Sequence, residues 1–113
     1  MASGDYERRA IERLCHRLRD ALGVASVAVW ARAPHTCVAT AGERRDDHLY
    51  PGAVPIRWDV DVVGDVLYAG GAGPPTIGQQ WLLTAAADLL APLVPLAASR
   101  TADAPETPAF GLV

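Results

Sequence analysis

The sequence predicts an α+β domain in which N- and C-terminal helices pack on one face of an antiparallel β-sheet. An amphipathic helical pattern opens the chain, four short strand-like segments fill its middle, and a long apolar helix follows them. Neither helix can bury its apolar side alone, so both need the sheet. Because the chain has 113 residues and 50% of them are apolar, we expect one compact domain over residues 5–98 and a flexible tail over residues 99–113.

Residues 5–22 carry the pattern of a helix with one apolar face. Charged residues of both signs, mostly Arg, occupy the opposite face, which is typical of a solvent-exposed helix surface. Gly23 follows, and glycine readily adopts the left-handed conformation that ends a helix. The predicted apolar face consists of Ile11, Leu14, Cys15, Leu18 and Leu22.

The middle of the chain predicts two antiparallel hairpins. Residues 24–32 and 36–41 are rich in β-branched and small side chains and form the first pair. Residues 54–58 and 62–69 form the second pair. A polar loop over residues 43–52 joins the two hairpins.

The final helix is predicted to run from Thr76 to about residue 98. Thr76 and Gln79 have the spacing of a capping box, in which each side chain bonds a free backbone amide of the first turn. Pro92 and Pro95 should kink this helix or end it early, because proline lacks the amide donor and clashes with the preceding turn. Trp81 is expected in the core.

The order of these elements and three segments resemble a GAF domain. The segments are the junction LGVASVAVW at residues 22–30, the hairpin with VPI at 54–56 and VVGDVL at 62–67, and the closing helix. In that helix the similar positions are Leu82, Leu83, Ala86, Ala87, Leu89 and Leu90. The resemblance covers residues 6–98 and implies the GAF fold and a place in bacterial signal transduction.

The sequence departs from the GAF pattern between the two hairpins. GAF domains usually carry several dozen residues there, which roof a ligand pocket, whereas this chain has only residues 43–53. We therefore expect an open, solvated sheet face and no enclosed pocket of nucleotide size, on the order of 300 Å³ or more. No cofactor is expected, and no ligand residue of the family can be transferred.

Composition excludes several classes of function. All ten basic residues are Arg, so lysine-dependent chemistry such as a Schiff base is excluded, and a net charge of -3 argues against nucleic-acid binding. Asp88 and two prolines interrupt the apolar stretch 81–98, which argues against membrane insertion. Cys15 and Cys37 are interpreted as small buried residues of a reduced, cytoplasmic protein. Asp46, Asp47 and His48 are interpreted as an exposed acidic turn, and we expect no metal site.

The closing helix has only a narrow polar stripe, so the sheet should cover only part of its apolar surface. We expect a homodimer formed through the terminal helices. The residues predicted for this interface are Leu83, Leu90, Val94, Leu14 and Leu18.

These observations lead to a prediction of function without an enzymatic reaction, because no catalytic signature is present. The leading hypothesis is a regulatory or protein-interaction module of bacterial signal transduction that binds a protein partner. The alternative is a small-molecule sensor that binds its ligand on the open sheet face, where arginines and indoles could hold a planar or anionic molecule. The candidate ligand residues are Trp30, Arg32, Arg57 and Trp58.

Overall fold

The computed structural model describes residues 3–98, so the predicted tail at 99–113 lies outside the described residues. The elements follow the predicted order, with one short 3-10 helix added between the hairpins. They are α1 (Ser3–Leu22), β1 (Ser26–Arg32), β2 (His35–Ala41), η1 (Asp47–Leu49), β3 (Gly52–Trp58), β4 (Asp61–Ala69) and α2 (Ile77–Leu90).

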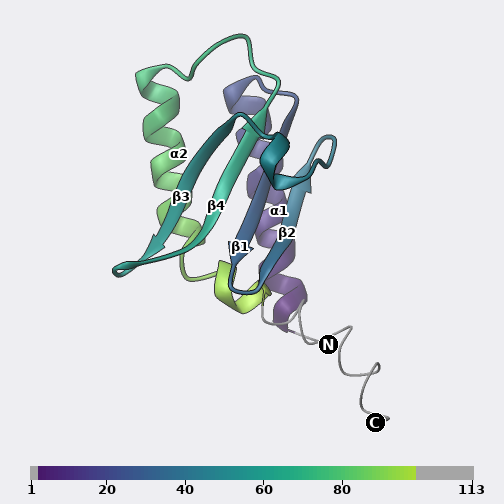
Figure 1. Ribbon diagram of the computed structural model, residues 1–113, viewed down its shortest axis with the longest axis vertical. Coiled ribbons are helices and arrows are strands. Elements are labelled where there is room, and N and C mark those ends of the chain that lie inside the picture. Colours follow the sequence, from purple (N-terminus) through teal and green to yellow (C-terminus); the bar gives the residue numbers. More distant parts are fainter. Residues whose placement is uncertain (1–2, 99–113) are drawn as a thin grey trace.

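The four strands form one antiparallel sheet in the order β2-β1-β4-β3. Each hairpin pairs its own strands, and β1 and β4 join the two hairpins at the centre of the sheet. Both helices lie behind the sheet in Figure 1, with α1 behind β1 and β2 and α2 beside β3. The α+β architecture with both helices on one face is therefore confirmed.

A single apolar core fills the space between the helices and the sheet. Alternate residues of each strand point into it, as expected for a sheet with one buried face. Ile11 and Cys15 of α1 meet Val29 of β1 and Ile56 of β3 in this cluster, and each of these side chains is fully buried.

The helix ends follow the chemistry that the sequence predicts. Gly23 has φ +66°, and its amide donates to the carbonyl of Arg19 at 3.0 Å. At the start of α2, the Thr76 amide donates to Gln79 Oε1 at 2.9 Å and the Gln79 amide donates to Thr76 Oγ1 at 3.1 Å. α2 ends at Leu90, and the chain turns through 91–93 before residues 94–98 become helical again. The interruption predicted at Pro92 is confirmed.

The side of α2 that is exposed to solvent is not the side predicted to form a dimer interface. Leu83, Leu90 and Val94 are at most 1% exposed because they point into the chain's own core, so they cannot contact a second copy. The same holds for Leu18 of α1, while Leu14 packs partly buried against the core. The predicted interface is therefore wrong for Leu83, Leu90, Val94 and Leu18. Trp81, expected in the core, is 75% exposed.

The sheet face opposite the helices is not open and solvated at its centre. The segment between β2 and β3 folds over it, with η1 in front of the sheet in Figure 1. Tyr50 is 6% exposed and packs in a second apolar cluster with Ala28 and Leu67. The Arg45 amide donates to the Tyr50 hydroxyl at 3.2 Å and anchors the ring. Residues 43–53 were predicted to be too few to cover this face of the sheet. The Tyr50 side chain nevertheless covers its centre.

Among residues 3–98, no helix is both long and apolar enough to cross a membrane.

Candidate active site on the sheet face opposite the helices

The register of β1 and β2 gathers the polar side chains of the first hairpin on one face. Trp30 pairs with Cys37, and Arg32 pairs with His35. Because side chains two positions apart on a strand point to the same side, these four residues share the face opposite the helices. A bulge between Val29 and Trp30 precedes this region and shifts the register of β2.

Cys37 is the thiol of this face. It is half-buried and packs against the cluster that contains Tyr50 and Leu67. Its Sγ donates to the carbonyl of Ala39 at 3.7 Å. Burial raises the pKa of the Cys37 thiol, and the positive charges of Arg44 and Arg8 partly offset that effect. The thiol is therefore mostly protonated at neutral pH and needs assistance to react.

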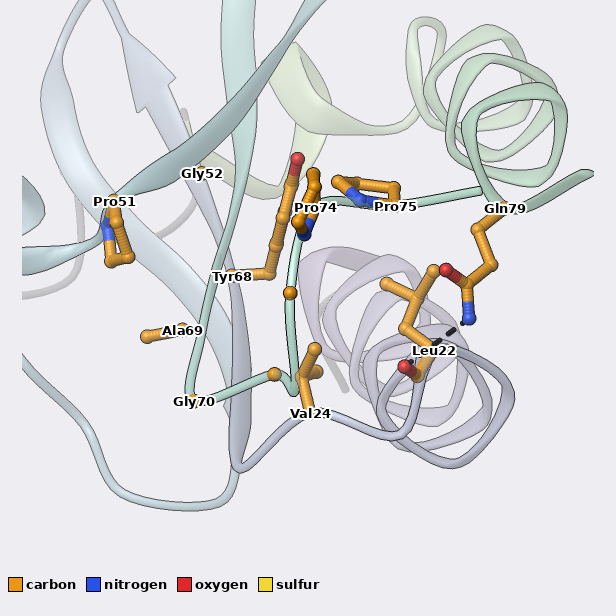
Figure 2. A pocket seen from close by; sticks show the side chains of 12 residues that line it. Leu22, Val24, Pro51, Gly52, Tyr68, Ala69, Gly70, Pro74, Pro75 and Gln79 are labelled. Carbon is orange, nitrogen blue, oxygen red and sulfur yellow. Dashed lines mark hydrogen bonds between the residues drawn. The ribbon is translucent and has the colours of Figure 1, made fainter. Parts of the chain in front are cut away.

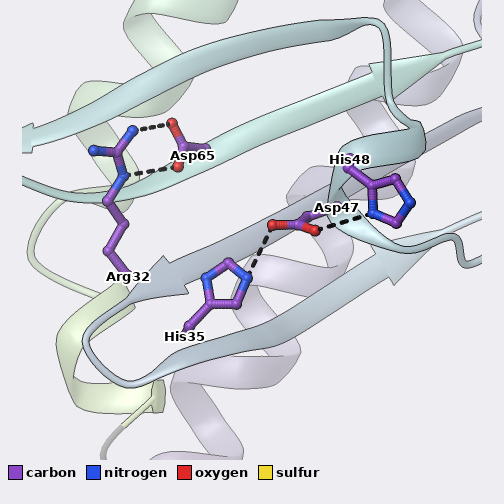
Figure 3. Close-up of polar contacts among 5 residues, drawn as sticks. All are labelled: Arg32, His35, Asp47, His48 and Asp65. Carbon is purple, nitrogen blue, oxygen red and sulfur yellow. Dashed lines mark hydrogen bonds and ion pairs between the residues drawn. The ribbon is translucent and has the colours of Figure 1, made fainter.

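An imidazole held by a carboxylate lies on the same strand. His35 Nε2 is 2.9 Å from Asp47 Oδ2, and the other oxygen of Asp47 is 3.7 Å from His48 Nδ1. The His35 ring also lies against the Trp30 indole, with ring centroids 4.9 Å apart. Figure 3 shows His35 on β2 facing Asp47, which η1 carries over the sheet. Asp47 thereby orients an acid–base group that stands two positions from Cys37.

A second ion pair lies next to the indole. Arg32 Nε and Nη2 donate to the two oxygens of Asp65, each at 3.0 Å (Figure 3). Asp65 is the register partner of Trp30 on β4. The hydrogen bonds to Asp65 raise the pKa of the Arg32 guanidinium. This pair sets one positive and one negative group side by side on the same face as the thiol.

The indole of Trp30 contributes an unused donor. Its Nε1 is buried and has no hydrogen-bond acceptor among the described residues. Buried donors of this kind are rare and call for a partner, because an unmade hydrogen bond costs free energy.

Cys15 is a thiol of a different kind. It is fully buried in the core behind the sheet. Burial, followed by the charges of Cys37 and Glu12, raises the pKa of Cys15 to about 12. Such a thiol is a packing residue, and the prediction that Cys15 is inert agrees with its burial.

The structure also holds a cavity of about 400 Å³ away from this face. It lies between the C-terminal end of α1 and the N-terminal end of α2, and it opens to solvent. Figure 2 shows Leu22, Tyr68 and Gln79 around it, with the Gln79 amide donating to the Leu22 carbonyl at 3.4 Å. Its volume exceeds the roughly 300 Å³ of a nucleotide-sized pocket. The cavity is nevertheless open to solvent, and residues 70–75 form much of its wall. Its lining includes no thiol, imidazole, carboxylate or guanidinium, and the Tyr68 phenol is its one ionisable side chain.

The predicted ligand residues fall into two groups. Trp30 and Arg32 belong to the face just described. Arg57 and Trp58 are exposed on β3, which β4 separates from β1. His35, Cys37 and Asp47 were not predicted as a group from the sequence. His35 lay just outside the strand predicted over 36–41, and β2 in fact begins at His35, which places it two positions from Cys37 on the same strand. Nothing in the sequence indicated that Asp47 would fold back over that strand.

No group of three or more His, Cys, Asp or Glu side chains is placed to hold a metal ion in the described part of the chain. Asp47, considered as a hard ligand in the acidic turn, instead pairs with His35 through one carboxylate oxygen and with His48 through the other.

Comparison with known proteins gives a similarity of fold to a solved structure. Neither a protein-family model nor a curated protein sequence matches the chain. Among solved structures, the chain is similar to a type II free methionine-R-sulfoxide reductase from Thermoplasma acidophilum. The TM-score is 0.65 and the sequence identity 16%, over 80% of this chain and 94% of that chain. The fold is shared with an enzyme.

This finding corrects the predicted function. A non-enzymatic regulatory or interaction module of signal transduction, with a ligand sensor as its alternative, was expected because no catalytic signature stood out in the sequence. The similar structure is that of an enzyme, and it supports the GAF-like fold without supporting a signalling role. The physical reason for the error is that the polar groups described above come together only through strand pairing and the fold of the covering segment.

Proposed function

We propose that this chain is a thiol-dependent reductase of a small sulfoxide, with Cys37 as the reacting thiol. The observation that carries the proposal is the placement of Cys37, half-buried, on one sheet face with His35, which Asp47 holds at 2.9 Å. The similarity of fold to a free methionine-R-sulfoxide reductase supports the reaction class. Membership of the GAF family and a reducing cytoplasmic location, in which Cys37 stays reduced, are part of the proposal.

The reaction balances with an external thiol as the reductant. The Cys37 sulfur attacks the sulfoxide sulfur, the S–O bond of the substrate breaks, and the oxygen is transferred to Cys37. The products are the sulfide and a sulfenic acid on Cys37. One external thiol then forms a mixed disulfide with Cys37 and releases water. A second external thiol displaces the first, which restores the Cys37 thiol and yields a small disulfide.

Cys15 is unsuited to act as the second thiol. It is fully buried in the core on the helix side of the sheet, whereas Cys37 packs in the cluster on the opposite side. The reductant in this proposal is therefore a small thiol from solution.

The neighbours of Cys37 match the polar parts of such a substrate. His35, oriented by Asp47, would give a proton to the sulfoxide oxygen as the S–O bond breaks. The buried indole N–H of Trp30 lacks an acceptor, and a sulfoxide oxygen is a strong one. The Arg32–Asp65 pair presents opposite charges, which suits the carboxylate and ammonium groups of a free amino acid.

The test is reduction of free L-methionine sulfoxide by the purified chain with dithiothreitol, followed as methionine by chromatography. We expect turnover that Cys37→Ser abolishes. Asp47→Asn should lower kcat more than it changes KM, because Asp47 acts through His35.

Cys15→Ala is the matched control, because it removes the other thiol and should retain turnover. Circular dichroism of each variant checks that the fold is kept. Equal turnover in Cys37→Ser, or no turnover by the folded, unmutated chain, would overturn the proposal. A comparison of free methionine sulfoxide with its N-acetylated form tests whether the Arg32–Asp65 pair recognises a free amino acid.

A further inference from the structure

We propose that the cavity between the C-terminal end of α1 and the N-terminal end of α2 is a second ligand site. It binds an uncharged, largely apolar ring compound that carries a hydrogen-bond acceptor. Its volume of about 400 Å³ lies in the range of small-molecule pockets. Neither Cys37 nor His35 lines it, so the site is separate from the candidate active site and the proposal does not depend on the proposed reaction.

The cavity exists because the loop between β4 and α2 has few side chains that fill it. Residues 70–75 read GGAGPP, and three of these positions are glycine. A Cβ atom at Gly73 would meet no atom within 4 Å beyond its chain neighbours, which shows open space beside the loop. Pro74 and Pro75 restrict the backbone where the loop runs along the cavity toward α2. The loop therefore spans this space without filling it.

The Gln79 side chain joins the two helix ends that flank the cavity. Its Nε2 donates to the Leu22 carbonyl at 3.4 Å (Figure 2), and its Oε1 accepts from the Thr76 amide at 2.9 Å. The carboxamide is thus engaged at both ends. Gln79 therefore acts as a fixed wall of the cavity, and the polar contact to a ligand has to come from another side chain.

Tyr68 supplies that polar contact. Tyr68 is the register partner of Gly52, and a Cβ atom at Gly52 would clash with the Tyr68 ring. Only glycine leaves room at this position, so the ring is held against β3 at the edge of the cavity. The Tyr68 hydroxyl makes no hydrogen bond to any other residue in the described part of the chain. It is therefore available to donate to an acceptor in the ligand.

The lack of charged groups in the lining fixes the class of ligand. No carboxylate, guanidinium or imidazole lines the cavity. A charged ligand would lose hydration here without gaining a counter-ion, which costs free energy. The side chains of Leu22, Val24, Pro51 and Pro74 instead offer apolar surface to a ring. A single acceptor on that ring satisfies the Tyr68 hydroxyl and orients the ligand.

NMR titration of the ¹⁵N-labelled full chain with benzamide is the first test, because benzamide is an uncharged ring with a carbonyl acceptor. We expect saturable shifts of the amide signals of Gly70, Gly71 and Gly73, with a Kd on the order of 1 mM for so small a molecule. Benzoate and benzylamine have similar shapes but are charged, so each should bind at least about tenfold more weakly. No saturable shift at the three glycines, or equally strong binding of benzoate, would overturn the proposal.

Tyr68→Phe tests the hydrogen bond. It keeps the ring against Gly52 and removes only the hydroxyl, so the fold should be retained. We expect it to weaken benzamide binding about fivefold and to leave the binding of toluene, which has no acceptor, unchanged. Tyr6→Phe is the matched control, because Tyr6 is 74% exposed on α1 and does not line the cavity; this variant should bind benzamide as the unmutated chain does. Unchanged benzamide affinity in Tyr68→Phe, or shifts that map to β2 around Cys37 in place of the loop, would contradict the assignment.

Discussion

Raising the pH should destabilise the fold through the thiol of Cys15. Cys15 is fully buried, and its pKa in the folded chain is raised to about 12 from an ordinary value of 9.0. As the pH rises above about 9, the unfolded chain loses this proton first, while the folded chain keeps it. The free energy of unfolding therefore falls as pH rises from about 9 toward about 12.

The size of the effect follows from the pKa difference. Each pH unit between the two pKa values removes about 1.4 kcal/mol, so about 2 kcal/mol is lost between roughly pH 9 and roughly pH 10.5. The absence of lysine simplifies the measurement, because no amino side chain titrates in this range. A Cys15→Ala variant lacks the Cys15 thiol, so its comparison with the unmutated chain isolates what that thiol contributes to the pH dependence.

The assay is urea denaturation of the unmutated chain and of Cys15→Ala at several pH values, with a reductant present. Near neutral pH the variant should be less stable by about 1 kcal/mol, because a packed side chain is shortened. The difference should shrink, vanish at about pH 9.7 and be reversed by about 1 kcal/mol at about pH 10.5. Two stability curves that stay parallel from neutral to alkaline pH would refute the assignment of a buried, protonated thiol to Cys15.

Two further substitutions test how the helices are held. Thr76→Ala should lower the free energy of unfolding by about 1 kcal/mol, because it removes one half of the capping box of α2. Thermal unfolding measures this loss. Thr84→Ala, on the exposed side of the same helix, serves as the control. Leu90→Ala should cost about 2–5 kcal/mol in urea denaturation, because a fully buried side chain leaves a cavity in the core. A cost below about 0.5 kcal/mol for Leu90→Ala would show that Leu90 is not a core residue.

The local elements could be predicted from the sequence because their causes are local. The apolar spacing of α1, the stop at Gly23 and the capping box at Thr76 each depend on residues within a few positions of one another. The interruption after Leu90 follows in the same way from Pro92. Once two helices each show an apolar side, their packing on one sheet face also follows, since no other surface could cover both.

The side of α2 that faces the sheet could not be predicted in the same way. α2 is apolar nearly all round, so periodicity did not separate its buried face from its outer face. Trp81 was expected inside and Leu90 at an interface, and the structure places each in the opposite position. Which side of α2 is buried depends on which of its side chains pack well against β3 and β4. Those contacts join residues distant in sequence and exist only in the folded chain.

The sequence by itself determined the α+β class, the order of the elements and the ends of the helices, because hydrophobic periodicity and capping act over one or two turns. Only the tertiary structure decided the candidate site. Pairing of β1 with β2 aligned Trp30 with Cys37, and the fold of the covering segment brought Asp47 within 2.9 Å of His35. The physical reason is that strand register and loop placement depend on contacts between residues distant in sequence, which no local pattern encodes.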